Sequence, residues 1–183
     1  MPDLSFHWFL PTYGDSRSIV GGGHGAPESA ARRDRPATLG YLTQIATAAE
    51  QMGFEAALTP TGLWCEDAFM TTSALLGTTK RLKFLVAFRP GLLSPTLAAQ
   101  MATTFQNLSQ GRLLLNVVVG GEPLEQRAMG DFLGKDARYE RADEFLTVVR
   151  ELWKHGDPFS FSGKHMTIEN ARLQAAPSPV PPL

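Results

Sequence analysis

The chain has 183 residues, of which 43% are hydrophobic and 19% charged, and its 17 Lys and Arg against 18 Asp and Glu give a formal net charge of -1. This is enough chain for one domain with a sizeable core, and the composition excludes a disordered protein. The near balance of charge argues against a nucleic-acid partner, and the short basic cluster 32–35 lies among Gly, Ala, Ser and Pro, which favours a solvated loop.

The cysteine content and the N-terminus indicate the compartment. Cys65 is the only cysteine, so no internal disulfide can form, which suits a reducing environment. Residues 1–3 are polar and acidic, unlike the basic start of a signal peptide. No stretch approaches the ~20 apolar residues of a membrane span. We therefore expect a cytoplasmic protein without a membrane partner.

The first part of the chain predicts two strands separated by a long loop and a helix. The run Leu4–Leu10 is apolar and almost continuous, which is typical of a strand buried on both faces. Residues 14–37 are rich in glycine and predict either a lid or binding loop or a disordered insertion. Helical periodicity then runs from Leu39 to Met52 and stops at Gly53, and Ala56–Thr59 predicts a short strand.

The next segments repeat the same alternation. They predict a helix from Glu66 to about Gly77, a strand at Leu82–Phe88, a helix from Ser94-Pro95 to Gly111, a strand at Leu113–Val119 and a helix at Asp136–Trp153. The apolar side of the helix after Ser94 is expected to consist of Leu97, Met101, Phe105 and Leu108. Four strand–helix units in succession predict an α/β fold with a parallel sheet and right-handed crossovers.

The C-terminal segment, residues 159–183, has a different character. Phe159–His165 predicts a small hairpin with Gly163 in its turn. Residues 176–183 are rich in proline, and such a segment normally leads into further structure. We therefore expect the chain to be the N-terminal part of a longer protein.

Several short motifs along the chain resemble one known family. They are Phe9-Leu10-Pro11-Thr12, Pro60-Thr61-Gly62 with Cys65-Glu66-Asp67, Arg81–Pro90 with Ser94-Pro95-Thr96, Leu108–Arg112, Arg138-Tyr139-Glu140 and Phe161–His165. In this order, from Leu4 to Leu183, they resemble the bacterial luciferase-like flavin-dependent monooxygenases, and among these the two-component alkanesulfonate monooxygenases.

The resemblance implies a TIM-barrel (β/α)8 fold, of which residues 1–183 would supply the first four β/α units and a following hairpin. It also implies reduced FMN as a cosubstrate, delivered by a separate NAD(P)H:flavin reductase. With O2 the flavin would form a peroxide that oxidises an alkanesulfonate or a related small organosulfur or apolar substrate. An open half-barrel has unpaired edges, so we expect a homo-oligomer or a longer chain.

The candidate cofactor-binding residues follow predicted strands or open a helix. Trp8 and Phe9 could form an apolar wall against the flavin or pack in a barrel core. Asn116 is polar within an apolar strand and should have a partner, because an unpaired buried amide costs roughly 1–3 kcal/mol. Gly120 allows close backbone approach or a plain turn. By resemblance Asn116 faces the flavin and Tyr139 reaches it; the alternative for Tyr139 is a packed aromatic side chain.

Cys65 and Arg89 are the candidate substrate-binding residues. Cys65 precedes a predicted helix, but Glu66 and Asp67 oppose a thiolate, so a nucleophile is not predicted; by resemblance it lies near the substrate. Arg89 could pair with a sulfonate or flavin phosphate, or form a surface salt bridge. The pair Leu63-Trp64 stands where the sulfonatases have a basic residue, which favours a more apolar substrate.

Two other readings of the chain remain open. The family's catalytic residues are expected in the missing half, so the chain could be a non-catalytic half-barrel that binds flavin or oligomerises. An F420-dependent oxidoreductase on the same fold is the other alternative. The four histidines have no metal-ligand spacing, so no metal is predicted.

Overall fold

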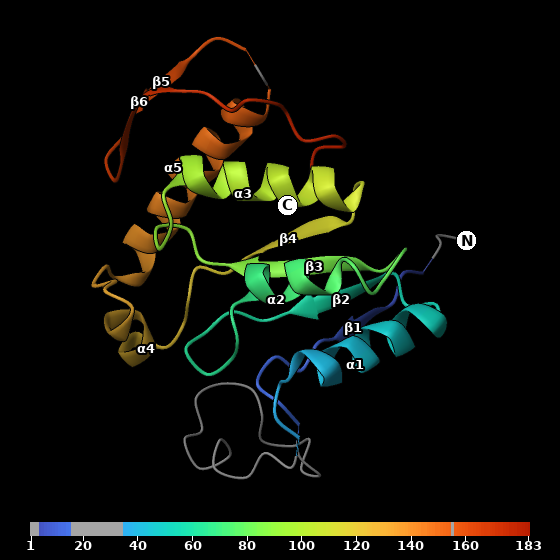
Figure 1. The fold of residues 1–183 in the computed structure, drawn as a ribbon. Coiled ribbons are helices and arrows are strands. Elements are labelled where there is room, and N and C mark those ends of the chain that lie inside the picture. The colour runs from blue at the N-terminus through green and yellow to red at the C-terminus, as the bar shows by residue number, and fades with distance from the viewer. Residues whose placement is uncertain (1–3, 16–34, 155) are drawn as a thin grey trace. The chain divides into compact units, whose positions relative to one another are not determined.

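The computed structural model describes residues 4–15, 35–154 and 156–183 (Figure 1). The chain divides into two compact units, Met1–Ala87 and Phe88–Leu183. Its main sheet has the strand order β1-β2-β3-β4, with helices between successive strands. This is the α/β arrangement predicted for the first four strand–helix units of a (β/α)8 fold.

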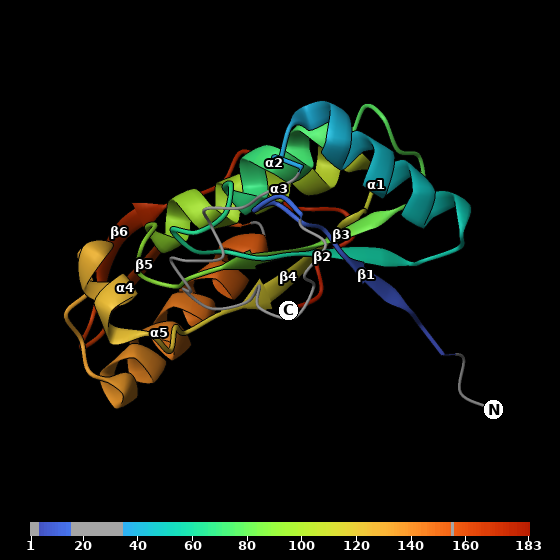
Figure 2. The same cartoon turned by 90° about the horizontal axis from the view of Figure 1, so that it is seen from below.

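The first unit contains three parallel strands and two helices. Its elements are β1 (His7–Phe9), α1 (Leu39–Gln51), β2 (Ala56–Thr59), α2 (Ala68–Leu75) and β3 (Lys83–Phe88), whose last residue begins the second unit. The register aligns His7 with Ala56 and Ala56 with Lys83. Helices α1 and α2 lie on the same side of these strands (Figure 2). In this unit Leu10, Leu75 of α2 and Phe84 of β3 are fully buried.

Local capping explains where these two helices begin. The Thr38 side chain accepts a hydrogen bond from Tyr41 N at 3.2 Å, and the Asp67 side chain accepts one from Met70 N at 2.8 Å. Such side chains satisfy N–H groups that have no partner within the helix. Helix α2 therefore begins at Ala68, two residues after the predicted start at Glu66, with Asp67 as its cap.

The first strand differs from its predicted burial. Leu4, Phe6, Trp8 and Phe9 are all exposed, and β1 itself is only three residues long. The expectation of a strand covered on both faces was wrong for this chain, because β1 lies at the edge of the sheet and pairs only with β2 among the described strands. Its apolar character indicates a strand, while its burial depends on neighbours.

The long loop after β1 is described only at its ends. Asp15 and Arg35 exchange backbone hydrogen bonds of 2.9 and 3.1 Å and also form an ion pair. The Tyr41 hydroxyl donates to Asp15 Oδ2 at 2.9 Å. Residues 16–34, on which the prediction of a lid or a disordered insertion falls, lie outside the described residues.

The second unit contains α3 (Pro95–Ser109), β4 (Leu113–Val117), α4 (Pro123–Ala128), α5 (Lys135–Trp153), β5 (Phe159–Ser162) and β6 (Thr167–Ala171). Ser94 caps α3, as predicted. The short helix α4 was not predicted, although Pro123 occupies a favoured first position and Glu122 caps it. Helices α3 and α5 lie side by side, and Trp153 Nε1 donates to Ala99 O at 3.3 Å (Figure 1).

The buried side of α3 differs from the predicted one. Leu97 is 43% exposed and Leu108 75% exposed, whereas Ala98, Ala99 and Ala102 are buried together with Phe105. Small side chains allow α5, with its large buried aromatic residues, to pack closely against this side. The prediction was therefore right for Phe105 and wrong for Leu97 and Leu108, because only the packing partner decides which side is covered.

The C-terminal segment is folded onto the second unit. Strands β5 and β6 form the predicted antiparallel hairpin with Gly163 in the turn. Further on, Pro182 O accepts a hydrogen bond from Leu115 N of β4 at 2.9 Å, and Pro179 O accepts one from Gln106 Nε2 at 2.8 Å. Among the described residues, no helix is long and apolar enough to cross a membrane.

Candidate functional site

Two buried hydroxyl groups mark the C-terminal ends of strands in the first unit. Thr12 follows β1 and Thr59 ends β2; both residues are fully buried. Neither Oγ1 atom has a hydrogen-bond partner among the described residues. Buried polar groups are normally paired, so each hydroxyl is available to a water or a ligand. Neither threonine was predicted as a site residue, since nothing local distinguishes them from threonines at other strand ends.

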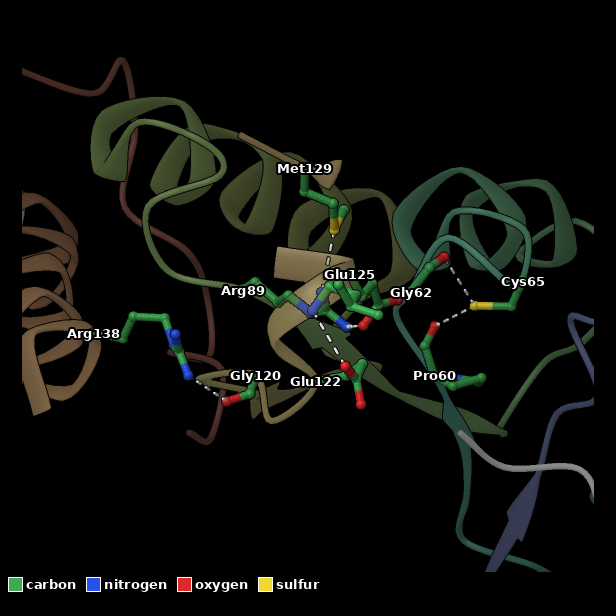
Figure 3. Close-up of polar contacts among 10 residues, drawn as sticks. Pro60, Gly62, Cys65, Arg89, Gly120, Glu122, Glu125, Met129 and Arg138 are labelled. Atoms are coloured by element: carbon green, nitrogen blue, oxygen red, sulfur yellow. Dashed lines mark hydrogen bonds and ion pairs between the residues drawn. The ribbon is translucent and has the colours of Figure 1, made fainter. Parts of the chain in front are cut away.

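Cys65 lies in the loop between β2 and α2. Its Sγ atom is 3.5 Å from Gly62 O and 3.7 Å from Pro60 O, and the side chain points toward both carbonyl groups (Figure 3). The residue is half-buried. A thiol can donate weakly to carbonyl oxygens, whereas a thiolate would be repelled by them. This geometry suits a positioned thiol rather than a nucleophile.

Aromatic side chains gather near the end of β1. The rings of Phe9 and Tyr13 are 6.1 Å apart, and those of Tyr13 and Trp64 are 5.3 Å apart. We call these three residues the aromatic cluster. Trp8 instead contacts Phe54, with ring centroids 5.1 Å apart at 62°. Trp8 is 47% and Phe9 40% exposed, so neither is enclosed in a core within its own unit.

In the second unit, the end of β4 is shaped by Gly120. Its φ is +89°, and a Cβ atom there would lie 2.1 Å from Gln126 Nε2. Gln126 is buried, and its Nε2 has no partner in the part of the chain that the structure describes. Glycine is thus required here by backbone conformation and by packing against Gln126. Asn116, within β4, is half-buried, so the full cost of an enclosed unpaired amide does not apply to it.

Arg89 forms an ion pair that the sequence did not predict. Its Nη2 atom lies 2.6 Å from Glu125 Oε2, and its Nη1 atom 3.1 Å from the sulfur of Met129 (Figure 3). Both ionic side chains are mostly buried. The sequence analysis proposed an external anion or a surface salt bridge for Arg89. It missed Glu125 because this partner belongs to the unpredicted helix α4.

The start of α5 brings further arginines to this part of the unit. Arg138 is buried and donates to Leu133 O at 2.6 Å and to Gly120 O at 3.2 Å. Arg141 Nη2 lies 2.6 Å from Asp131 Oδ2. Burial alone would raise the pKa of Asp131, but the hydrogen bonds from Arg141 and Leu133 and the nearby arginine charges outweigh it and lower the pKa. Tyr139 follows Arg138 and is 56% exposed.

The predicted site residues therefore fall into two groups. Trp8, Phe9 and Cys65 belong to the first unit. Asn116, Gly120 and Tyr139 belong to the second, together with Arg89. Within the second unit, Arg138 links the backbone at Gly120 to the helix turn that carries Tyr139. No group of three or more metal-binding side chains occurs among residues 4–15, 35–154 and 156–183.

The second group offers features that fit a flavin cofactor. Gln126 Nε2 is a buried donor without an acceptor among the residues described. The same unit holds Arg138, which donates to Gly120 O, and two arginine–carboxylate pairs, Arg89 with Glu125 and Arg141 with Asp131. The open space around the Cα of Gly121 leaves its backbone accessible. Donors and positive charge of this kind suit the polar, anionic side of a flavin nucleotide.

Comparison with known proteins identifies the class of this fold. The model of the luciferase-like monooxygenase family matches residues 4–183. The chain belongs to this family.

Solved structures of several enzymes have a similar fold. A long-chain alkane monooxygenase has a TM-score of 0.80 at 20% identity, with 100% of this chain and 51% of that chain covered. A riboflavin lyase, solved with modified FMN and riboflavin, has a TM-score of 0.80 at 20% identity, with 98% of this chain and 49% of that chain covered. An F420-dependent secondary alcohol dehydrogenase has a TM-score of 0.77 at 20% identity, with 98% of this chain and 51% of that chain covered. The chain spans about half the length of these proteins.

Proposed function

We propose that the protein containing this chain is a monooxygenase that uses reduced FMN as a cosubstrate together with O2. The observation that carries this proposal is the end of β4 in a fold of the luciferase-like family, where Gly120 packs against the buried Gln126 amide and its carbonyl oxygen accepts a hydrogen bond from Arg138. Bound FMN supplies the oxygen chemistry, so the residues of this chain act by binding and orienting it.

Each candidate cofactor residue has a physical role in this proposal. The half-buried Asn116 offers an amide that can donate and accept hydrogen bonds. Gly120 places no side chain at the end of β4, and the exposed Tyr139 offers a ring and a hydroxyl. Trp8 and Phe9 are exposed aromatic surfaces suited to covering an isoalloxazine ring and excluding water.

We further propose a small, largely apolar substrate, with alkanesulfonates and related organosulfur compounds as the first candidates. The aromatic cluster supplies an apolar surface close to Cys65 in sequence, and the pair Leu63-Trp64 stands where a cation after Gly62 would favour a sulfonate. Arg89 already pairs with Glu125. A sulfonate at Arg89 therefore has to compete with a carboxylate, which supports the apolar end of this substrate range.

The partners of this reaction belong to the same proposal. A separate NAD(P)H:flavin reductase would supply the reduced FMN. A homo-oligomer is supported by the exposed Leu4 and Phe6, which precede the edge strand β1, and by the exposed Trp8 within it, since such apolar surface is normally covered. Light scattering after size-exclusion chromatography would test it, and a monomer would contradict it. We also propose a cytoplasmic location, because NAD(P)H is supplied there and Cys65 cannot form an internal disulfide.

The decisive experiment is an anaerobic titration of the full protein with reduced FMN, with oxidised FMN and reduced F420 as comparisons. Tight binding of reduced FMN, followed by O2-dependent oxidation of an alkane or release of sulfite from a sulfonate when the reductase is added, would support the proposal. Binding of F420 alone would favour the alternative suggested by the dehydrogenase fold match. Failure to bind any flavin would favour a non-catalytic chain.

A variant at Trp64 tests the substrate class. Trp64→Arg introduces the missing cation and removes one ring of the aromatic cluster. We expect it to lower the KM for an alkanesulfonate relative to an alkane of equal length. Met52→Arg, at an exposed position that ends α1, is the matched control. An unchanged preference in Trp64→Arg would contradict a role for this cluster in substrate selection.

A further inference from the structure

We propose that Arg138 is a positioning residue, which fixes the backbone of Gly120 relative to Tyr139 and so aligns the cofactor-binding end of β4 with α5. The effect of Arg138 on cofactor binding rests on the proposed function, since Gly120 and Tyr139 are candidate cofactor ligands. Figure 3 shows the contact of Arg138 with Gly120, and a second hydrogen bond joins Arg138 to Leu133.

One guanidinium group joins two separate loops. Arg138 Nη2 donates to Gly120 O, in the segment between β4 and α4, at 3.2 Å. Its Nη1 donates to Leu133 O, just before α5, at 2.6 Å. Tyr139 is the next residue on the helix. The distance between the strand end and the helix turn that carries Tyr139 is thus set through a single side chain.

Both loops are held from their other sides as well. The Gln126 amide packs where a Cβ of residue 120 would lie, so Gly120 is confined between Gln126 and Arg138. Leu133 N donates to Asp131 Oδ1 at 3.2 Å, and Asp131 pairs with Arg141. Leu133 is consequently fixed through its N–H and its C=O. These contacts leave the backbone at 120 and 133 little freedom once Arg138 is in place.

The chemistry of this position favours arginine. A guanidinium directs its N–H groups in fixed, coplanar directions and can bond two carbonyl groups at once, whereas an ammonium is a point charge on a flexible stem. Arg138 is 7% exposed, and its hydrogen bonds to Leu133 and Gly120 go to backbone carbonyls rather than to a carboxylate. Burying a cation in this way carries a desolvation cost that its hydrogen bonds offset only in part, which fits a role in fixing geometry rather than in stabilising the fold.

The test compares Arg138→Lys, Arg138→Met and Arg138→Ala with Arg150→Met, an exposed arginine on the same helix. Two quantities are measured in the full protein, well below its melting temperature. One is amide hydrogen exchange in residues 119–122 and 131–134. The other is the Kd for reduced FMN.

We expect exchange in both segments to become at least 10-fold faster in all three Arg138 variants, and the Kd to rise at least 10-fold. Added guanidinium ion should restore the affinity of Arg138→Ala but not that of Arg138→Met, whose side chain fills the space. Arg150→Met should behave as the natural protein. Rescue of this kind would not follow from a loss of stability alone.

The outcomes separate this inference from the proposed function. Natural protein that binds no flavin would refute the proposed function, while the exchange measurement would still test the bracing by Arg138. Exchange at 119–122 and 131–134 that stays unchanged in Arg138→Lys and Arg138→Met would overturn the inference. So would full flavin affinity in both of these variants. If Arg138→Met fails to fold, Arg138→Lys and the guanidinium rescue of Arg138→Ala decide the question.

Discussion

Gly120 is a residue at which backbone conformation and side-chain packing both restrict substitution. Its φ of +89° lies in the region that L side chains rarely adopt, and the space of a Cβ is filled by Gln126. We expect Gly120→Ala to destabilise the protein by about 2–4 kcal/mol, combining backbone strain with overpacking. Urea unfolding would measure the change.

The neighbouring glycine provides the control for this prediction. A Cβ atom at residue 121 would have no other atom within 4 Å, and the φ of Gly121 is not positive. Gly121→Ala should therefore change the free energy of unfolding by less than about 0.5 kcal/mol. In the double variant Gly120→Ala with Gln126→Ala, the steric part of the loss should disappear while the backbone part remains. Equal losses in both single glycine variants would contradict this account.

Other residues could be assigned only after their surroundings were known. Ser94 was found as a cap from the sequence because capping involves residues two or three positions apart, whereas Asp67, the cap of α2, was predicted only within the start of that helix. Arg89 was a candidate, but its partner Glu125 lies 36 positions away on a helix that was not predicted. Thr12 and Thr59 gave no signal, because a buried hydroxyl without a partner is recognised only once its neighbours are placed.

At the scale of elements, Glu50 ties the end of α1 to the loop before β3. Its Oε2 accepts hydrogen bonds from Lys80 N, Arg81 N and Leu82 N at 2.8, 2.6 and 2.8 Å. Burial tends to raise the pKa of Glu50, but the three backbone donors and the nearby Arg81 charge lower it below the ordinary 4.5. The ionised carboxylate therefore holds this loop.

The sign of the pH dependence follows from that lowered pKa. The unfolded chain binds the proton more tightly, so the stabilisation by Glu50 is present above about pH 4.5 and is lost as pH falls through the folded-state pKa. We expect Glu50→Gln to cost about 1–2 kcal/mol at pH 7 and less at pH 3. Urea unfolding at both pH values would measure it.

Exposed Glu169 on β6 supplies the matched control. Glu169→Gln should leave the stability nearly unchanged at both pH values. If Glu50→Gln lost as much stability at pH 3 as at pH 7, the ionised form of Glu50 would not be the source of its contribution.

The sequence predicted most elements but not their buried sides. The strand Ala56–Thr59 and the helix after Ser94 were located correctly, since apolar runs, caps and breakers are local features. The exposed Leu108 on α3 and Phe6 before β1 were expected to be covered. Burial of a side chain depends on which element packs against it, and periodicity does not contain that information.

At the scale of the whole molecule, the proline-rich segment 177–183 is part of the second unit. Gln106 is fully buried and bonds both Leu113 N, at 2.9 Å, and Pro179 O, at 2.8 Å. Pro182 O accepts from Leu115 N. The segment thus supplies acceptors to α3 and to β4.

Deletion of residues 177–183 should therefore destabilise the second unit. Two donors lose their partners and two buried prolines, Pro177 and Pro181, are removed, so we expect a loss of about 2–4 kcal/mol. Urea unfolding measures the loss, and hydrogen exchange at Leu115 locates it. Deletion of Leu183 alone keeps both hydrogen bonds and should have little effect. Unchanged exchange at Leu115 in the longer deletion would contradict the prediction.

The sequence by itself determined the alternation of strands and helices, the helix starts and the family, because these depend on residues close together in the chain and on short motifs. Only the tertiary structure decided the pairing of Arg89 with Glu125, the bracing of Gly120 by Arg138 and the exposure of β1. These features join residues far apart in the chain, and their energies come from burial and from the loss of water around charged and polar groups. Such energies are defined only after the elements have packed.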